Sequence, residues 1–147
     1  LWFVIANRVI DGLDGAVARA SRSSDFGGYL DIISDFIFYS AIPLAFAVAR
    51  PETALAAAFL IFSFIGTATS FLGFAILAEK HQVTTQIRGK KAFYYLGGLT
   101  EGTETILLLL AMLVWPDYFS LMAIIFGILC WVTTSTRIYA AYRQFND

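Results

Sequence analysis

The stretch that decides the fold is DGLDGAVARASRSSDFGGYLDIISD, residues 11–35, which holds five acidic residues. Apolar sequence surrounds it, with LWFVIANRVI (1–10) before it and FIFYSAIPLAFAVA (36–49) after it. Carboxylates therefore lie within sequence that otherwise has the composition of membrane spans. Ionisable residues inside membrane segments are costly and are usually functional, so Asp11, Asp14, Asp31 and Asp35 require a specific partner.

The composition of the whole chain points to a membrane protein. Hydrophobic residues make up 59% of the 147 residues and charged residues 14%, with a mean hydropathy of +0.71. Soluble domains have roughly 45–50% apolar and about 25% charged residues. We expect a single transmembrane domain over 1–147, preceded by an N-terminal segment, because the chain starts inside an apolar run without Met. The formal net charge of −1 gives no reason to expect a nucleic-acid partner.

A spanning helix needs about 20 mostly apolar residues. Five stretches of the sequence meet this requirement, and they cover residues 1–20, 29–49, 53–79, 93–115 and 119–143. The breaks between them are polar or contain proline. ARPET places Pro51 at a helix start, with Thr53 as a possible cap. The predicted fold class is therefore an all-α, polytopic transmembrane helix bundle with five spans.

Basic residues set the expected orientation, because short cytoplasmic loops are rich in Lys and Arg. Five alternating spans place eight of the ten basic residues near one side, namely Arg19, Arg22, Lys80, Arg88, Lys90, Lys91, Arg137 and Arg143. The other side holds Arg50 alone, and Arg8 lies within the first span. We expect the first side to face the cytosol.

The aspartates form two pairs with helical spacing. Asp11 and Asp14 are three residues apart and Asp31 and Asp35 four apart, so each pair shares a helix face. A tight loop brings both pairs to the same membrane end. Oxygen-only ligands favour hard cations such as Mg²⁺ or Mn²⁺, and two such ions are a common arrangement for phosphoryl chemistry. A buried acid–base cluster and an acidic rim facing the loop are the alternatives.

Small residues accompany the aspartates. Gly15 follows Asp14, and Gly27 lies four residues before Asp31, near the start of the next helix. Such a placement suits close approach of a phosphate to a helix N-terminus, although a flexible turn explains Gly27 equally well. Arg19 at the mouth of the site would pair with a phosphate or anchor its helix at the interface.

These residues together resemble the signature of the CDP-alcohol phosphotransferase family. The matching pattern is Asp11-x-x-Asp14-Gly15-x-x-Ala18-Arg19 followed by Gly27-x-x-x-Asp31-x-x-x-Asp35. The interval between Arg19 and Gly27 is one residue shorter than the family usually has, but both aspartate pairs keep their spacing. Members usually have six spans, so the resemblance implies that the family's first span precedes this chain.

The resemblance also implies a location in a bacterial inner membrane, an activity and residue roles. Family members transfer a substituted phosphate from a CDP-alcohol, often CDP-diacylglycerol, to an acceptor alcohol and release CMP. Asp11, Asp14, Asp31 and Asp35 would hold two metal ions, and Asp35 would also act as general base. The expected nucleotide-binding residues are Gly15, Ala18, Arg19, Ser24 and Gly27. The expected partners are a CDP-activated lipid donor, an acceptor alcohol, membrane lipid and, as a homodimer, a second copy of the chain.

A second polar group lies in the fourth predicted span. Glu101 and Glu104 share a helix face and would bind the hydroxyl or amine groups of the acceptor, or form an internal salt bridge with Arg137. Arg88, Lys90 and Lys91 of RGKK would bind anionic head groups or a phosphorylated acceptor, or only set the topology.

Two other functions compete with phosphotransfer. An ion or proton transporter would also need intramembrane acids, but it would spread them across the membrane midplane, often in repeated halves. Here the aspartates cluster at one end and no repeat is visible. A catalytically inactive partner subunit of the family is the third possibility, and the intact aspartate positions argue against it.

Overall fold

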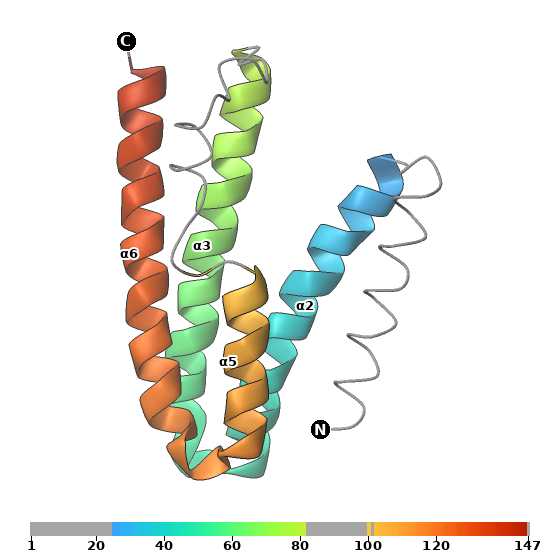
Figure 1. Ribbon diagram of the computed structural model, residues 1–147, viewed down its shortest axis with the longest axis vertical. Coiled ribbons are helices and arrows are strands. Elements are labelled where there is room, and N and C mark those ends of the chain that lie inside the picture. The colour runs from blue at the N-terminus through green and yellow to red at the C-terminus, as the bar shows by residue number, and fades with distance from the viewer. Residues whose placement is uncertain (1–24, 82–99, 101, 147) are drawn as a thin grey trace.

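A computed structural model of the chain describes residues 25–81, 100 and 102–146. The elements within these ranges are four α-helices and two short 3₁₀ helices. In chain order they are α2 (Asp25–Ala49), η1 (Pro51–Thr53), α3 (Ala54–Lys80), α5 (Gly102–Val114), η2 (Pro116–Tyr118) and α6 (Phe119–Phe145). No strand occurs in this described part of the chain, which confirms the predicted all-α class (Figure 1).

Three helical segments within the described ranges are long and apolar enough to cross a membrane. They are Phe26–Ala49, Pro51–Lys80 and Pro116–Phe145, and α5 is a shorter apolar helix. Large apolar side chains cover their outer faces: Leu55 is 85% exposed and Val48 76% exposed. An exposed surface of this kind suits lipid rather than water. Three predicted spans are thus confirmed. The span at 1–20 and residues 93–99 and 101 of the span at 93–115 fall outside the described residues.

The start of α2 differs from the prediction. The sequence suggested a polar loop through residue 28, but the helix already begins at Asp25 and includes Gly27 and Gly28. Glycine costs a helix only about 1 kcal/mol relative to alanine, so two glycines near a helix end do not prevent it from extending. The alternative of a flexible turn at Gly27 is therefore wrong.

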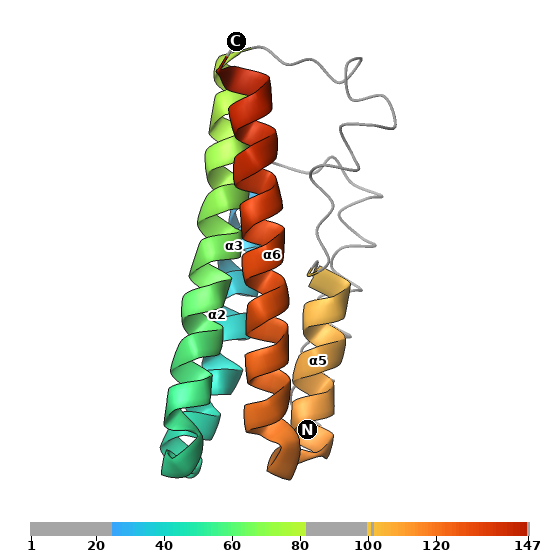
Figure 2. The same cartoon turned by 90° about the vertical axis from the view of Figure 1, so that its left-hand side faces the viewer.

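The helices run alternately up and down the bundle. The N-terminal end of α2 and the C-terminal ends of α3 and α6 lie at one end, and the two 3₁₀ corners lie at the other (Figure 1). Toward its N-terminus α2 leans away from α3, and α5 begins partway along the bundle (Figures 1 and 2). This arrangement matches the alternating direction of spans that the basic residues predicted.

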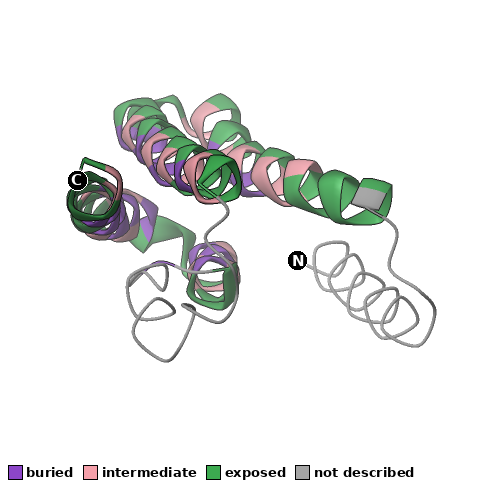
Figure 3. Ribbon diagram, turned by 90° about the horizontal axis from the view of Figure 1, so that it is seen from above, coloured by how far each residue is buried: buried purple, intermediate pink, exposed green. Residues whose placement is uncertain are grey.

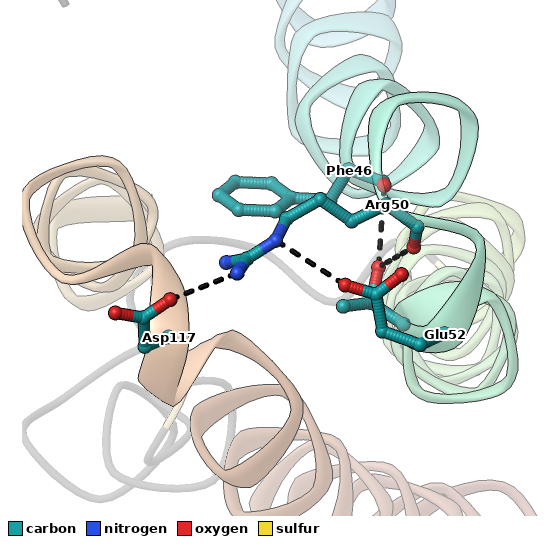
Figure 4. Close-up of polar contacts among 5 residues, drawn as sticks. Phe46, Arg50, Glu52 and Asp117 are labelled. Atoms are coloured by element: carbon teal, nitrogen blue, oxygen red, sulfur yellow. Dashed lines mark hydrogen bonds and ion pairs between the residues drawn. The ribbon is translucent and has the colours of Figure 1, made fainter.

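An ion pair joins the two 3₁₀ corners. Arg50 lies between α2 and η1, and its Nη2 is 2.8 Å from Oδ1 of Asp117 in η2, while its Nε is 3.4 Å from Oε1 of Glu52 (Figure 4). Thr53 precedes α3, but its hydroxyl donates backward to the carbonyls of Arg50 and Phe46 rather than capping α3. The prediction that the Thr53 side chain caps α3 is therefore wrong, because its hydroxyl binds carbonyl groups of the preceding corner instead.

The core lies where α3 packs along α6, with α2 and α5 against this pair (Figure 2). Buried faces point inward from all four helices and exposed faces outward (Figure 3). Phe46 of α2 stacks on Phe119 of α6 with ring centroids 4.1 Å apart. The central cluster includes the fully buried or nearly fully buried residues Ala57, Leu60, Leu109, Met112, Phe119, Ala123 and Cys130.

Gly127 allows α3 and α6 to approach closely. A methyl group at this position would lie 2.5 Å from Cε1 of Phe59 and 3.0 Å from Oγ of Ser63, both on α3. Small residues serve this purpose in membrane helices, because helices in lipid associate through close packing rather than through the hydrophobic effect.

We expect Gly127→Ala to lower stability by about 1–3 kcal/mol, the usual cost of overpacking a filled contact. Thermal melting in detergent measures the effect. Gly73→Ala is the matched control, because nothing lies within 4 Å of a methyl group on Gly73 of the same helix pair. Equal melting temperatures for the two variants would show that the close approach at Gly127 is not needed.

Candidate active site

One face of α2 carries the described part of the predicted site. Gly27, Asp31, Asp35 and Tyr39 follow at four-residue intervals, so they lie in one row along this helix. Gly27 and Asp31 are exposed, Asp35 is half-buried and Tyr39 is only 7% exposed. The row therefore descends from the open end of the bundle into its interior.

Most of the other predicted site residues lie outside the described part of the chain. These are Asp11, Asp14, Gly15, Ala18, Arg19, Ser24, Arg88, Lys90, Lys91 and Glu101. Their roles stay predictions. Within 25–81, 100 and 102–146, no group of three or more His, Cys, Asp or Glu residues is close enough to hold a metal.

Asp31 and Asp35 nevertheless fit half of a metal site. They provide two carboxylates one turn apart on a single face, at the end of the bundle where α2 leans away from α3 (Figure 1). Carboxylate oxygens are the ligands that Mg²⁺ and Mn²⁺ prefer. Asp31 forms no ion pair with any residue of the described part. The donor set thus suits a hard divalent cation.

Arg137 lies inside the bundle, although the sequence grouped it with the basic residues near the cytosolic side. Its side chain comes from α6 and is buried, with the residue 8% exposed. Its Nη1 donates to the carbonyl oxygen of Thr67 on α3 at 3.2 Å, and its guanidinium carbon lies 5.6 Å from the centre of the Phe71 ring. Arg137 therefore contributes less to the membrane orientation than an interfacial arginine would.

Glu104 lies in the first turn of α5 and its side chain is exposed. It makes no ion pair with Arg137, and both residues belong to the described part of the chain. The internal salt bridge that the sequence offered as an alternative is thus absent for Glu104. The corresponding pair with Glu101 falls outside the described residues.

The structure adds a polar layer that the sequence analysis missed. The hydroxyl of Thr100 donates to the hydroxyl of Thr133 on α6 at 3.2 Å, and both residues are buried. Close by along the chain, a methyl group on Gly102 would lie 3.3 Å from the Tyr39 hydroxyl. The four-residue spacing from Asp35 was the one sequence signal that pointed to Tyr39.

The fold defines a class: a polytopic membrane protein, here with two carboxylates, Asp31 and Asp35, on one face of α2. The family model for CDP-alcohol phosphatidyltransferase matches residues 1–139, and the chain belongs to this family. Membership confirms the predicted phosphotransferase class and gives the transporter hypothesis no support.

Three curated relatives match the chain. It is similar to the "Inner membrane protein YnjF" of Escherichia coli (strain K12), with 54% identity over 100% of this chain and 72% of the relative. It is also 30% and 29% identical to the CDP-diacylglycerol–serine O-phosphatidyltransferases of two Helicobacter pylori strains, over 68% of this chain and 50% of each relative. No solved structure matches the chain.

The contrast between Glu104 and Arg137 gives a stability prediction. We expect Glu104→Gln to change the free energy of unfolding by no more than about 0.5 kcal/mol, as for an ordinary surface substitution. Arg137→Gln should cost about 1.5–3 kcal/mol, because it removes a buried, charge-assisted hydrogen bond to Thr67. Melting curves of both variants in the same detergent measure the difference. A strongly destabilised Glu104→Gln protein would contradict the exposed position of this side chain.

Proposed function

We propose that the chain transfers a substituted phosphate from a CDP-alcohol, in particular CDP-diacylglycerol, to the hydroxyl group of an acceptor, with release of CMP. Family membership and the printed names of the Helicobacter pylori relatives support this reaction class. The observation that carries the proposal is the placement of Asp31 and Asp35 on one α2 face at the open end of the bundle. The name of the Escherichia coli relative supports the inner membrane as the location.

The metal-binding residues of the proposal are Asp11, Asp14, Asp31 and Asp35, which would hold two Mg²⁺ or Mn²⁺ ions. When bound, such ions neutralise charge on a pyrophosphate and on departing CMP. The nucleotide side of the site would be formed by Gly15, Ala18, Arg19, Ser24 and Gly27. Gly27 lies one turn before Asp31 on the same helix face.

Asp35 is the proposed general base. Its carboxylate would accept the proton of the acceptor hydroxyl as that oxygen forms a bond to the phosphorus of the CDP-alcohol. The bond between this phosphorus and the CMP oxygen breaks, and CMP leaves with the electron pair. Half-burial suits this role, because Asp35 is reachable from the open end yet lies one turn deeper than Asp31.

The acceptor side of the proposed site would be formed by residues of other segments. Arg137 and Glu104 come from α6 and α5, and Glu101, Arg88, Lys90 and Lys91 are the other proposed acceptor or lipid contacts. These residue types suit an acceptor with hydroxyl, amine or anionic groups. We further propose a cytosolic active site and a homodimer, as the family resemblance implies.

Release of CMP tests the proposal. Purified full-length protein, given CDP-diacylglycerol labelled in its cytidine, should release labelled CMP with at least one member of a panel of serine, glycerol, glycerol 3-phosphate, ethanolamine and inositol. EDTA should abolish the release, and Mg²⁺ or Mn²⁺ should restore it, because the ligands are all oxygen. Failure to release CMP with every acceptor, or full turnover in EDTA, would contradict the proposed function.

Variants of two aspartates separate metal binding from base chemistry. Asp35→Asn keeps the side-chain shape but removes the proton acceptor, so we expect donor binding to survive largely while turnover falls roughly 10²-fold or more. Asp14→Asn should weaken donor binding as well, since it removes a metal ligand. Titration with CDP-diacylglycerol and turnover are measured for both variants. Equal proportional losses of binding and rate in the two variants would refute this division of roles.

A further inference from the structure

The C-terminal half of α2 is fixed in the core of the bundle. Ile42 is 7% exposed, and the side chain of Pro43 next to it is fully buried. Three residues further along the helix, Phe46 stacks on Phe119 of α6 with ring centroids 4.1 Å apart. Arg50, directly after the helix, forms the ion pair that joins the two 3₁₀ corners. Movement of this half would therefore disrupt packing against α6.

The N-terminal half of α2, which carries Asp31 and Asp35, is held by much less burial. No side chain from Phe26 to Phe38 is buried, and Phe26 and Tyr29 are 66% and 58% exposed. Over the same turns the helix leans away from α3 (Figure 1). Segments that bury few side chains are displaced at a lower energetic cost than segments of the core.

Pro43 lies where the two halves of α2 meet, inside the helix. Proline has no N–H to donate to the backbone ladder, and its ring crowds the preceding turn, so it weakens a helix and favours a bend there. Membrane helices tolerate such interruptions, and a hinge is formed by a few residues that absorb the change in backbone angles. The weakened point of the helix thus coincides with the boundary between its buried and exposed halves.

The aspartates are far enough from Pro43 for a small bend to matter. Asp35 lies eight residues before Pro43 and Asp31 twelve residues before it, which is roughly 12 Å and 18 Å along the helix. A rotation of about 10° at Pro43 would displace the two aspartates by roughly 2 Å and 3 Å over these lengths. Mg²⁺ requires near-ideal geometry at about 2.0–2.1 Å, so displacements of this size make or break carboxylate coordination.

We propose that Pro43 is a hinge that positions Asp31 and Asp35. The half of α2 before Pro43 swings toward α3 when CDP-diacylglycerol and Mg²⁺ bind, and the half after Pro43 stays fixed in the core. Pro43 is a positioning residue, because it acts through the two aspartates. This proposal rests on the proposed function, which supplies the donor and the role of the carboxylates.

Distances between spin labels on the full-length protein test the hinge. One label pair uses Tyr29→Cys on α2 and Ile76→Cys on α3, two exposed positions. The matched control pair uses Val48→Cys with Ile76→Cys, since Val48 is 76% exposed and follows Pro43 on α2. Both pairs carry Cys130→Ala, which removes the native thiol. Addition of CDP-diacylglycerol and Mg²⁺ should shorten the first distance by roughly 2–4 Å and change the control distance by less than about 1 Å.

A substitution at the hinge gives a second, independent measurement. Pro43→Ala supplies the missing N–H and stiffens α2, so the shortening between positions 29 and 76 should fall to less than about half of its original size. Ile42→Ala is the matched control, because it removes buried volume at the neighbouring position without adding a backbone hydrogen bond. The Ile42→Ala protein should keep the full shortening. Should Pro43→Ala fail to fold, the two label pairs decide alone.

The failure of the hinge is distinguishable from the failure of the proposed function. An unchanged distance between positions 29 and 76, in a protein that releases CMP, would overturn the hinge and leave the function intact. Equal changes in both label pairs, or full shortening in Pro43→Ala, would overturn it as well, because the helix would then move as a rigid body or bend elsewhere. Absence of CMP release by the unmodified protein with every acceptor would overturn the proposed function and the hinge with it.

Discussion

The close contact between α3 and α6 is the constraint on which the rest of the bundle depends. Both helices have 27 residues, and a side chain at Gly127 would collide with Phe59. In lipid, such close approach and interhelical hydrogen bonds replace the hydrophobic effect as the force that joins helices. The hydrogen bond from Arg137 to the Thr67 carbonyl belongs to this same contact. Once α3 and α6 are fixed, Phe46 stacking on Phe119 positions α2, and the Arg50–Asp117 pair joins the two corners.

The position of α5 follows from that frame. It begins at Gly102, partway along the bundle, so the described parts of α2, α3 and α6 extend beyond it toward the open end (Figures 1 and 2). The Thr100–Thr133 hydrogen bond holds the chain against α6 just before α5 starts. The hydroxyl of Tyr39 on α2 lies close to Gly102 at the start of α5. Buried hydroxyls of α2 and α6 thus lie close to the segment that begins α5.

The sequence predicted the helix ends and faces that depend on the local residue pattern. It missed the contacts that depend on how the helices pack against one another. The lengths of the apolar runs predicted each end of α3 and α6 to within two residues. The four-residue spacing correctly placed Asp31 and Asp35 on one face of α2. The contact of Tyr39 with Gly102 joins positions far apart in the chain, and no periodicity within either helix encodes it. Charge counting grouped Arg137 with the residues near the cytosolic side, and the pairing with Glu101 or Glu104 put it inside the bundle; its burial depends on the register of α6 against α3, which no local pattern encodes.

The distribution of polarity along the interior explains why phosphotransfer suits this bundle better than transport. Asp31 and Asp35 lie toward the end where α2 begins, the buried hydroxyls of Tyr39, Thr100 and Thr133 follow, and beyond Thr105 the described interior is mostly apolar, with Leu109, Met112 and Phe119 beside the buried hydroxyl of Ser63. A translocated ion would find few ligands along that stretch, at a high desolvation cost. In the proposed reaction a CDP-lipid would have no such need, because its charged part would stay near the aspartates while its acyl chains remained in the bilayer.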